Sequence, residues 1–234
     1  MSETAILMAA GMGTRMRPLT ETTPKPLIKV NGKPMIETVL DGLKNRGVEK
    51  FLVVVGYLGK QFGYLEEKYE NLKVVENKDY QTINNISSIK AVANELIKSQ
   101  DDVFICEADL YVSDSSIFNA QLDHSCYYGR MVKGHSDDWV FEQYEEGHII
   151  RVGKAGNDCF NMVGIAWFKN YDAHMLGKLI EERYGTEGFE ELFWDDVVNE
   201  NLDELNLIVH EVYEGQLVEI DTVDELKEID SSYK

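Results

Sequence analysis

The chain has 234 residues, of which 44% are hydrophobic and 28% charged, and it is long enough to bury a core without disulfide or metal support. Its 23 Lys and Arg residues against 42 Asp and Glu residues give a formal net charge of −19. Because such a surface repels phosphate backbones and anionic lipids, we expect neither nucleic acid nor membrane partners. The three cysteines lie far apart and form no CxxC pair, which predicts reduced thiols in a cytoplasmic protein.

Strand and helix patterns alternate over the first 106 residues. Short apolar runs followed by glycine or polar residues predict buried strands at 6–10, 51–55, 72–75 and 103–106. Apolar residues at helical spacing predict helices over 35–46, 59–69 and 85–98. This alternation is typical of a parallel sheet with helices on both faces.

Beyond residue 125 the predicted strands follow one another more closely. We expect strands at 127–132, 139–144, 148–152 and 162–168, with a turn at Gly147-His148. The elements expected after these are helices at 171–184 and 189–200, strands at 206–212 and 217–220, and a helix from about 222. No repeat or linker marks a boundary, so we expect one α/β domain over 1–234, with a mostly parallel mixed central sheet flanked by helices and a smaller mixed β portion after residue 125.

Basic residues gather in one N-terminal segment of this acidic chain. Residues 11–33 contain a single acid, Glu21, and five cations: Arg15, Arg17, Lys25, Lys29 and Lys33. A cationic loop that contains glycines favours an anionic ligand. A solvated basic loop that balances nearby carboxylates would have the same composition, and composition alone does not separate the two.

The loop at residues 9–17 has the backbone chemistry of a phosphate site. Gly11 and Gly13 allow a ligand close to the backbone and let N–H groups turn toward an anion. Arg15 offers a planar donor fork, and a proline on each side restricts Lys25. The loop has neither the third glycine of a dinucleotide fingerprint nor a P-loop sequence, so an ordinary turn with exposed cations is the alternative.

Two longer stretches carry a family resemblance. Residues 7–20, LMAAGMGTRMRPLT, and 23–36, TPKPLIKVNGKPMI, resemble the signature of nucleotidyltransferases that activate sugar phosphates and related phosphates. The resemblance implies a Rossmann-like nucleotidyltransferase fold, with a nucleotide-binding part over about 1–125 and an acceptor-binding part over about 126–234. It implies that Arg15 and Lys25 contact the phosphates. The nucleotide-binding positions that it implies are Ala9, Ala10, Gly11, Gly13, Thr14, Arg15 and Lys25.

Two carboxylates follow predicted strands where a metal could bind. Asp109 follows the strand at 103–106, and Asp221 follows Ile220; two hard oxygen ligands suit Mg²⁺ together with substrate phosphates. Each could instead cap a turn or a helix. The resemblance selects these two as metal ligands and matches Lys154 to a lysine that contacts the acceptor phosphate. The catalytic set that it implies, with Mg²⁺ as cofactor, is Arg15, Lys25, Asp109, Lys154 and Asp221.

The expected reaction needs no serine, cysteine or histidine nucleophile. A phosphate monoester is largely ionised near neutral pH because its second pKa is about 6. Its oxygen can attack the α-phosphorus of a nucleoside triphosphate in line, and pyrophosphate leaves.

Three further segments narrow the resemblance. Residues 55–58, 84–88 and 193–195 resemble the CTP:phosphocholine cytidylyltransferases of bacteria that decorate their envelope glycans with choline. CTP, phosphocholine and the product CDP-choline are therefore expected. Asn84 and Ser88 could recognise cytosine or ribose through their donor and acceptor groups, although a helix cap explains an asparagine there equally well.

Two clusters of aromatic and acidic residues suit a quaternary ammonium, which aromatic faces and carboxylates bind. Trp139 follows two aspartates, and Phe193 stands where the resemblance leads us to expect tyrosine. The acceptor-binding residues that the resemblance implies are Trp139, Lys154, Glu191, Phe193, Trp194 and Asp195. Each aromatic could instead belong to the core.

Two other acceptors and one non-enzyme remain as alternatives. The 2-aminoethylphosphonate cytidylyltransferases resemble the same family, and a primary ammonium would prefer carboxylates to a full aromatic cage, so the geometry of Trp139 and Trp194 discriminates. A sugar-1-phosphate would need amide and hydroxyl donors that residues 189–196 lack. A nucleotide-binding regulatory module would not need both metal carboxylates.

Overall fold

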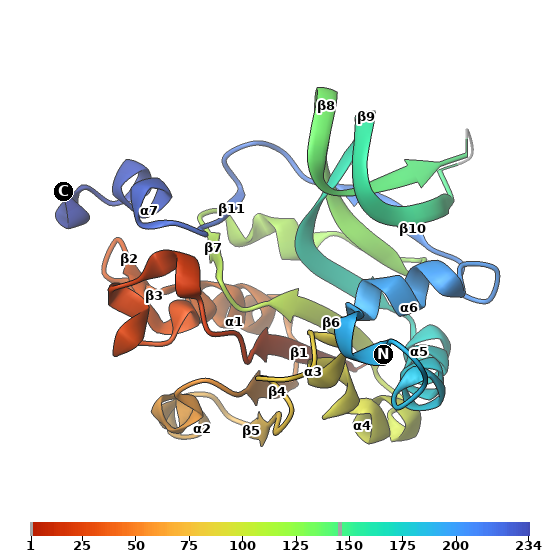
Figure 1. Ribbon diagram of the computed structural model, residues 1–234, viewed down its shortest axis with the longest axis horizontal. Helices are drawn as coiled ribbons and strands as arrows, with labels where there is room; N and C mark the ends of the chain where they lie inside the picture. Colours follow the sequence, from red (N-terminus) through yellow and green to blue (C-terminus); the bar gives the residue numbers. More distant parts are fainter. Residues whose placement is uncertain (1, 145–146) are drawn as a thin grey trace.

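The computed structural model describes residues 2–144 and 147–234 (Figure 1). Its main sheet has the strand order β10-β8-β9-β6-β1-β4-β5. The bounds of these strands are β1 Glu3–Ala9, β4 Lys50–Val55, β5 Leu72–Glu76, β6 Asp102–Glu107, β8 Cys126–Gln143, β9 Ile149–Phe168 and β10 Ile208–Glu211. Strands β1, β4, β5 and β6 are parallel, whereas β9 is antiparallel to β6 and β8. The predicted α/β class with a mostly parallel mixed sheet is confirmed.

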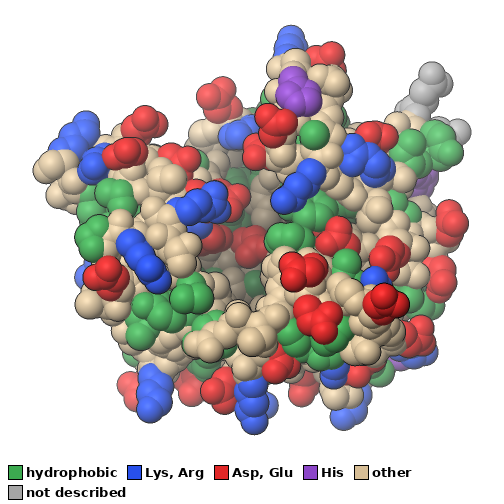
Figure 2. Space-filling model, in the orientation of Figure 1, with side chains coloured by type: hydrophobic (Ala, Val, Ile, Leu, Met, Phe, Trp, Pro, Cys, Tyr) green, Lys and Arg blue, Asp and Glu red, His purple; other side chains and the backbone are tan. Residues whose placement is uncertain are grey.

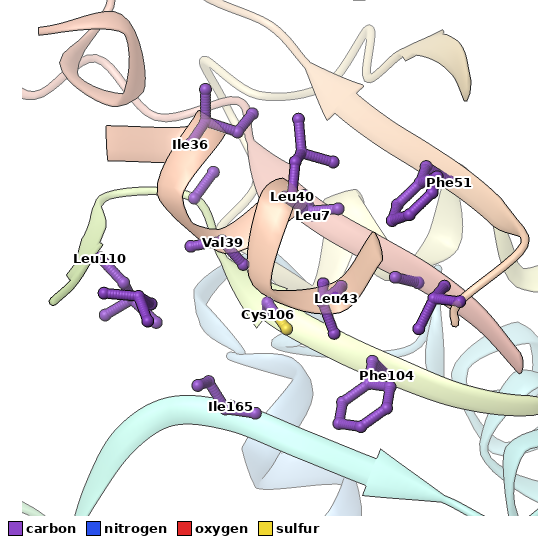
Figure 3. Close-up of a cluster of buried hydrophobic side chains, with 14 of the residues drawn as sticks. Leu7, Ile36, Val39, Leu40, Leu43, Phe51, Phe104, Cys106, Leu110 and Ile165 are labelled. Carbon is purple, nitrogen blue, oxygen red and sulfur yellow. The ribbon is translucent and has the colours of Figure 1, made fainter. Parts of the chain in front are cut away.

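Helices cover both faces of this sheet. On one face lie α1 (Met35–Arg46) and α2 (Tyr64–Lys68), and the other carries α3 (Ile86–Lys90), α4 (Ala93–Lys98), α5 (Asn170–Arg183) and α6 (Trp194–Glu200). Successive side chains of a strand point to opposite faces. Leu7 accordingly packs with Val39 and Leu40 of α1 (Figure 3), while Ile6 packs with Ile89 of α3.

A small ribbon joins distant parts of the chain. Strand β7 (Leu110–Val112) pairs antiparallel with β11 (Leu217–Glu219), and Leu110 lies opposite Glu219. A separate core buries Met16 of the glycine loop with Ile220 and with Leu226 of α7 (Val223–Ile229). Strands β2 (Lys29–Val30) and β3 (Lys33–Pro34) form a hairpin beside it. The C-terminal segment is thereby held against the N-terminal loop.

Among the predicted bounds that differ from the structure, two concern whether an element is continuous. The helix expected over 85–98 is interrupted after Lys90 and continues as α4, but its apolar positions stay on one buried face, so spacing could not reveal the break. The four strands expected between 127 and 168 form two long strands, β8 and β9, which stay paired through several register shifts; the pair folds back on itself, so that Val140 and Phe141 each pair with two separate parts of β9. The expected turn forms at Gly147, whose N–H donates to Tyr144; residues 145–146 lie outside the described residues.

The three cysteines are buried and form no disulfide. Within residues 2–144 and 147–234, no helix has the length and apolarity to cross a bilayer.

Candidate active site

The carboxyl ends of the parallel strands open onto a cleft, and Figure 2 shows this hollow with acidic side chains at its bottom. One part of it is lined by Ala9, Gly11, Gly13, Thr14, Arg15, Lys25, Glu107, Asp109, Glu219 and Asp221, among others. The adjoining part, about 630 Å³, includes Asp138, Trp139, Lys154, Asn161, Phe193 and Asp195 in its lining. Because Arg15, Glu107, Glu219 and Asp221 line both parts, ligands in the two parts would meet at these residues.

The glycine loop is fitted closely to Lys25. Gly13 has φ +59°, in the left-handed region that glycine adopts without strain. A Cβ atom at Gly13 would stand 2.8 Å from Cβ of Lys25 and 3.1 Å from a methyl of Thr20. The Thr20 hydroxyl donates to the carbonyl of Gly13 at 2.8 Å. Gly13 is therefore required both by the backbone conformation and by the lysine packed against it.

Lys25 joins the two aspartates expected to bind metal. Its Nζ lies 2.6 Å from Oδ2 of Asp109 and 2.6 Å from Oδ1 of Asp221. Arg15 Nη2 lies 2.8 Å from the same Oδ1 of Asp221. Burial lowers the pKa of Lys25, but the two carboxylates outweigh it and raise the pKa above its usual value. The ammonium is therefore a fixed positive charge between the aspartates.

A third carboxylate completes this cluster. Oxygen atoms of Asp109, Glu219 and Asp221 lie within 4.8 Å of one another. Asp109 Oδ1 is buried and, in the described part of the chain, accepts no hydrogen bond. Desolvation and the neighbouring charges of Asp109 and Asp221 raise the pKa of Glu219 to about 7. A set of converging oxygen atoms with an unused buried acceptor fits a hard divalent cation such as Mg²⁺.

The register of the small ribbon explains why these carboxylates meet. Asp109 immediately precedes β7, and Asp221 lies two residues after the end of β11. Since the strands run antiparallel with Leu110 opposite Glu219, the start of one and the end of the other lie at the same edge. Glu107 also lines this part of the cleft, and burial raises its pKa well above the usual range.

On the other side of the cleft, Lys154 lies against two aromatic rings. Its Nζ is 5.8 Å from the ring centre of Trp139 and 5.6 Å from that of Phe193. These two rings meet edge to face, with centres 5.3 Å apart. Trp139 and Lys154 are paired across β8 and β9, so the hairpin itself sets their contact.

Two of the residues expected at the acceptor site lie outside the lining of the larger cavity. Trp194 is 3% exposed and stacks on Tyr127 in the core, 5.6 Å between ring centres, so it does not line the larger cavity. As the first residue of α6, it faces the apolar side of the helix with Val197 and Val198. Glu191 is exposed in the preceding turn and does not line this cavity either.

The nucleotide-binding positions outside the loop have structural partners. The Asn84 amide donates to the carbonyl of Glu191 at 3.1 Å, and the buried Ser88 hydroxyl accepts from Asn77 at 3.2 Å. Within the loop, Ala10 is buried, and its carbonyl accepts a hydrogen bond from the backbone N–H of Tyr57. Recognition of the base by Asn84 and Ser88 stays a prediction.

Comparison with known proteins decides the family. The model described as the MobA-like NTP transferase domain matches residues 5–166, which include the glycine loop, Lys25, Asp109 and Lys154. The chain belongs to the MobA-like NTP transferase family. It is therefore a nucleotidyltransferase, as the N-terminal signature implied.

Among the proteins similar to this chain are cytidylyltransferases. A 2-aminoethylphosphonate cytidylyltransferase from Lancefieldella rimae is 52% identical over 98% of this chain and 92% of its own. A choline-phosphate cytidylyltransferase from Streptococcus pneumoniae is 34% identical over 98% of both chains. The solved CTP:phosphocholine cytidylyltransferase from Streptococcus pneumoniae superposes with a TM-score of 0.89 at 31% identity and covers all of both chains.

Sequence reasoning missed two glutamates that line the cleft. Glu107 and Glu219 each precede a site aspartate by two residues, in the parallel motifs Glu-Ala-Asp and Glu-Ile-Asp. Each glutamate ends its strand, the aspartate follows two residues later, and all four side chains line the same part of the cleft. The repeated Glu-x-Asp pattern was therefore the signal that could have found them.

Asp195 is a buried acid whose protonation is linked to stability. It is 4% exposed and accepts from the Tyr127 hydroxyl at 3.0 Å; burial raises its pKa to about 7 from 3.8. The carboxyl group of Asp195 thus binds its proton more tightly in the folded protein than in the unfolded chain. The protonated carboxyl group therefore contributes to the free energy of unfolding at low pH, and this contribution is lost as the pH rises from about 4 to about 7.

We expect Asp195→Asn to remove this pH dependence. Between pH 5 and pH 8, the free energy of unfolding of wild type should fall by roughly 2–3 kcal/mol more than that of the variant, since one pKa unit corresponds to about 1.4 kcal/mol. Urea denaturation at both pH values measures the difference. The exposed Asp203→Asn serves as control, and an equal response of both variants would contradict the assignment.

Proposed function

We propose that this nucleotidyltransferase transfers CMP from CTP to 2-aminoethylphosphonate and releases pyrophosphate. The observation that carries the proposal is the lining of the acceptor cavity. Trp194 lies in the core, so Trp139 and Phe193 are the aromatic residues that line the cavity within the described ranges, and Asp137 and Asp138 adjoin them. Two rings with carboxylates suit a primary ammonium better than a quaternary one, which prefers an aromatic cage.

This proposal reverses the order of the two sequence-based candidates. The sequence analysis preferred phosphocholine and kept 2-aminoethylphosphonate as the alternative. The position of Trp194 supports the alternative, as does the 52% identity to a 2-aminoethylphosphonate cytidylyltransferase. Both acceptors are small zwitterions with an anionic phosphorus group and a cationic tail, so the chemistry of transfer is the same.

The charges in the cleft account for the reaction. The triphosphate of CTP would lie along the glycine loop, where Arg15 and Lys25 offset the charge that develops on the departing pyrophosphate. Lys154 would hold the phosphonate so that one of its oxygens attacks the α-phosphorus in line. The bond to the β-phosphate oxygen breaks as the new phosphorus–oxygen bond forms, and the phosphonate needs no separate nucleophile.

Asp109, Glu219 and Asp221 would hold a divalent cation beside these groups. Such a cation, when bound, neutralises phosphate charge and lets the two anionic substrates approach.

An acceptor comparison tests the proposed function. Pyrophosphate release is measured with CTP and Mg²⁺ for 2-aminoethylphosphonate, phosphocholine and glucose-1-phosphate, and with UTP and dTTP in place of CTP. We expect the highest kcat/KM with CTP and 2-aminoethylphosphonate, by about 10-fold or more over phosphocholine, because charge-assisted hydrogen bonds contribute about 1.5–3 kcal/mol each. A higher kcat/KM with phosphocholine would overturn the proposed identity of the acceptor. No pyrophosphate release with any pair of substrates would favour a nucleotide-binding module.

A further inference from the structure

One polar group in the acceptor cavity has no partner. Asn161 of β9 lines this cavity and is 7% exposed. Its Oδ1 is buried and accepts no hydrogen bond from any described residue. A buried amide oxygen left without a donor costs about 1–3 kcal/mol, so a structure that keeps one there normally supplies a donor from elsewhere.

The orientation of the Asn161 amide is fixed by its other end. Nδ2 donates to the Ser136 hydroxyl at 2.8 Å and to Oδ2 of Asp138 at 3.1 Å. An ionised carboxylate only accepts hydrogen bonds, so the opposite amide orientation would bring two acceptors together. The amide nitrogen therefore faces Asp138, and the amide oxygen is the atom left unpaired.

The needs of this oxygen and the charges around it indicate which group can bind here. It needs a hydrogen-bond donor, and the carboxylates of Asp137 and Asp138, which line the same cavity, favour a donor that also carries a positive charge. A primary ammonium carries three N–H donors and can serve the amide oxygen and a carboxylate together. A quaternary ammonium carries no N–H and would leave the oxygen unpaired.

We infer that Asn161 is a specificity-determining residue, whose Oδ1 accepts a hydrogen bond from the primary ammonium of the acceptor and so discriminates against its methylated forms. This inference rests on the proposed function, because it names the contact that recognises the tail of the proposed acceptor. Trp139 and Phe193 would then cover the ethylene chain of the acceptor, and Lys154 its phosphonate.

A methylation series of the acceptor tests this contact. The substrates are 2-aminoethylphosphonate and its N-methyl, N,N-dimethyl and N,N,N-trimethyl derivatives, each with CTP and Mg²⁺. For wild type we expect kcat/KM to fall by about 10- to 100-fold from the primary to the trimethyl compound. For Asn161→Ala we expect kcat/KM for the primary amine to fall toward that for the trimethyl compound. The ratio of these two kcat/KM values should therefore decrease, while KM for CTP is unchanged.

Two controls keep the outcomes separate. Asn157→Ala removes an exposed asparagine of the same strand that contacts His135 and does not line the cavity, and it should keep the wild-type ratio. Thermal unfolding reports whether Asn161→Ala is folded; if it is not, the wild-type series still decides. A wild type that uses 2-aminoethylphosphonate but shows no loss along the series overturns the inference, as does a folded Asn161→Ala that keeps the wild-type ratio. A wild type that prefers phosphocholine overturns the proposed function itself.

Discussion

Replacing Asp109 with asparagine is expected to lower turnover by about 10²–10³-fold or more while the protein stays folded. The variant keeps an oxygen toward Lys25 but removes one negative charge from the cluster with Glu219 and Asp221. A neutral amide oxygen is a weaker ligand for a hard cation than a carboxylate. Pyrophosphate release with CTP and acceptor, titrated with Mg²⁺, measures the effect, and higher Mg²⁺ should recover part of the activity.

The fold of Asp109→Asn can be checked independently. Its thermal midpoint should stay within about 4 °C of wild type, or roughly 1 kcal/mol for a chain of this size, because Lys25 keeps its ion pair with Asp221 and the repulsion among the three carboxylates falls. Asp123→Asn is the matched control, because Asp123 is an exposed carboxylate outside the cleft. Near-normal turnover of Asp109→Asn at limiting Mg²⁺ would show that Asp109 is not a ligand of the metal.

The elements of the parallel sheet were predictable from sequence because their patterns are local. A buried strand such as β1 is a continuous apolar run, and α1 shows its buried face at helical spacing. The long strands β8 and β9 were divided by prediction because polar residues and Gly134 interrupt the alternation where the strands bend. A bend and a turn have the same local composition, and only pairing between distant residues separates them.

The side of the cleft that holds Lys25 was more predictable than the side that holds Lys154. The resemblance selected Lys25, Asp109 and Asp221, and the structure brings all three within ion-pair distance. On the side of the cleft with Lys154, residues that are neighbours in the sequence have different surroundings. Phe193 and Trp194 are neighbours, yet one lines the cavity and the other lies in the core, because residues at a helix start point to different sides.

Asn161 carries no sequence signal of its own. It is one asparagine within a long strand, and its importance comes from Ser136 and Asp138, which lie more than twenty residues away and occupy its amide nitrogen. Sequence shows which groups are present, whereas an unpaired atom is visible only after every other pairing is known.

Replacing Lys25 with methionine is expected to affect both activity and stability. Turnover should fall by about 10²-fold or more, because the fixed charge that faces the departing phosphates is lost. Without added metal the variant should also be destabilised, since Asp109 and Asp221 lose the ammonium that lies 2.6 Å from each. Breaking a buried ion pair costs about 3–5 kcal/mol, and the lower end applies because the two carboxylates are 21% and 23% exposed.

The same variant separates the role of Lys25 from that of the carboxylates. In wild type the ammonium competes with any cation for the oxygens of Asp109 and Asp221, so Mg²⁺ alone should raise the thermal midpoint of Lys25→Met more than that of wild type. Lys29→Met, which removes an exposed lysine of the same segment, should respond as wild type does. Equal Mg²⁺ responses of Lys25→Met and wild type would mean that the ammonium and the metal do not share these carboxylates.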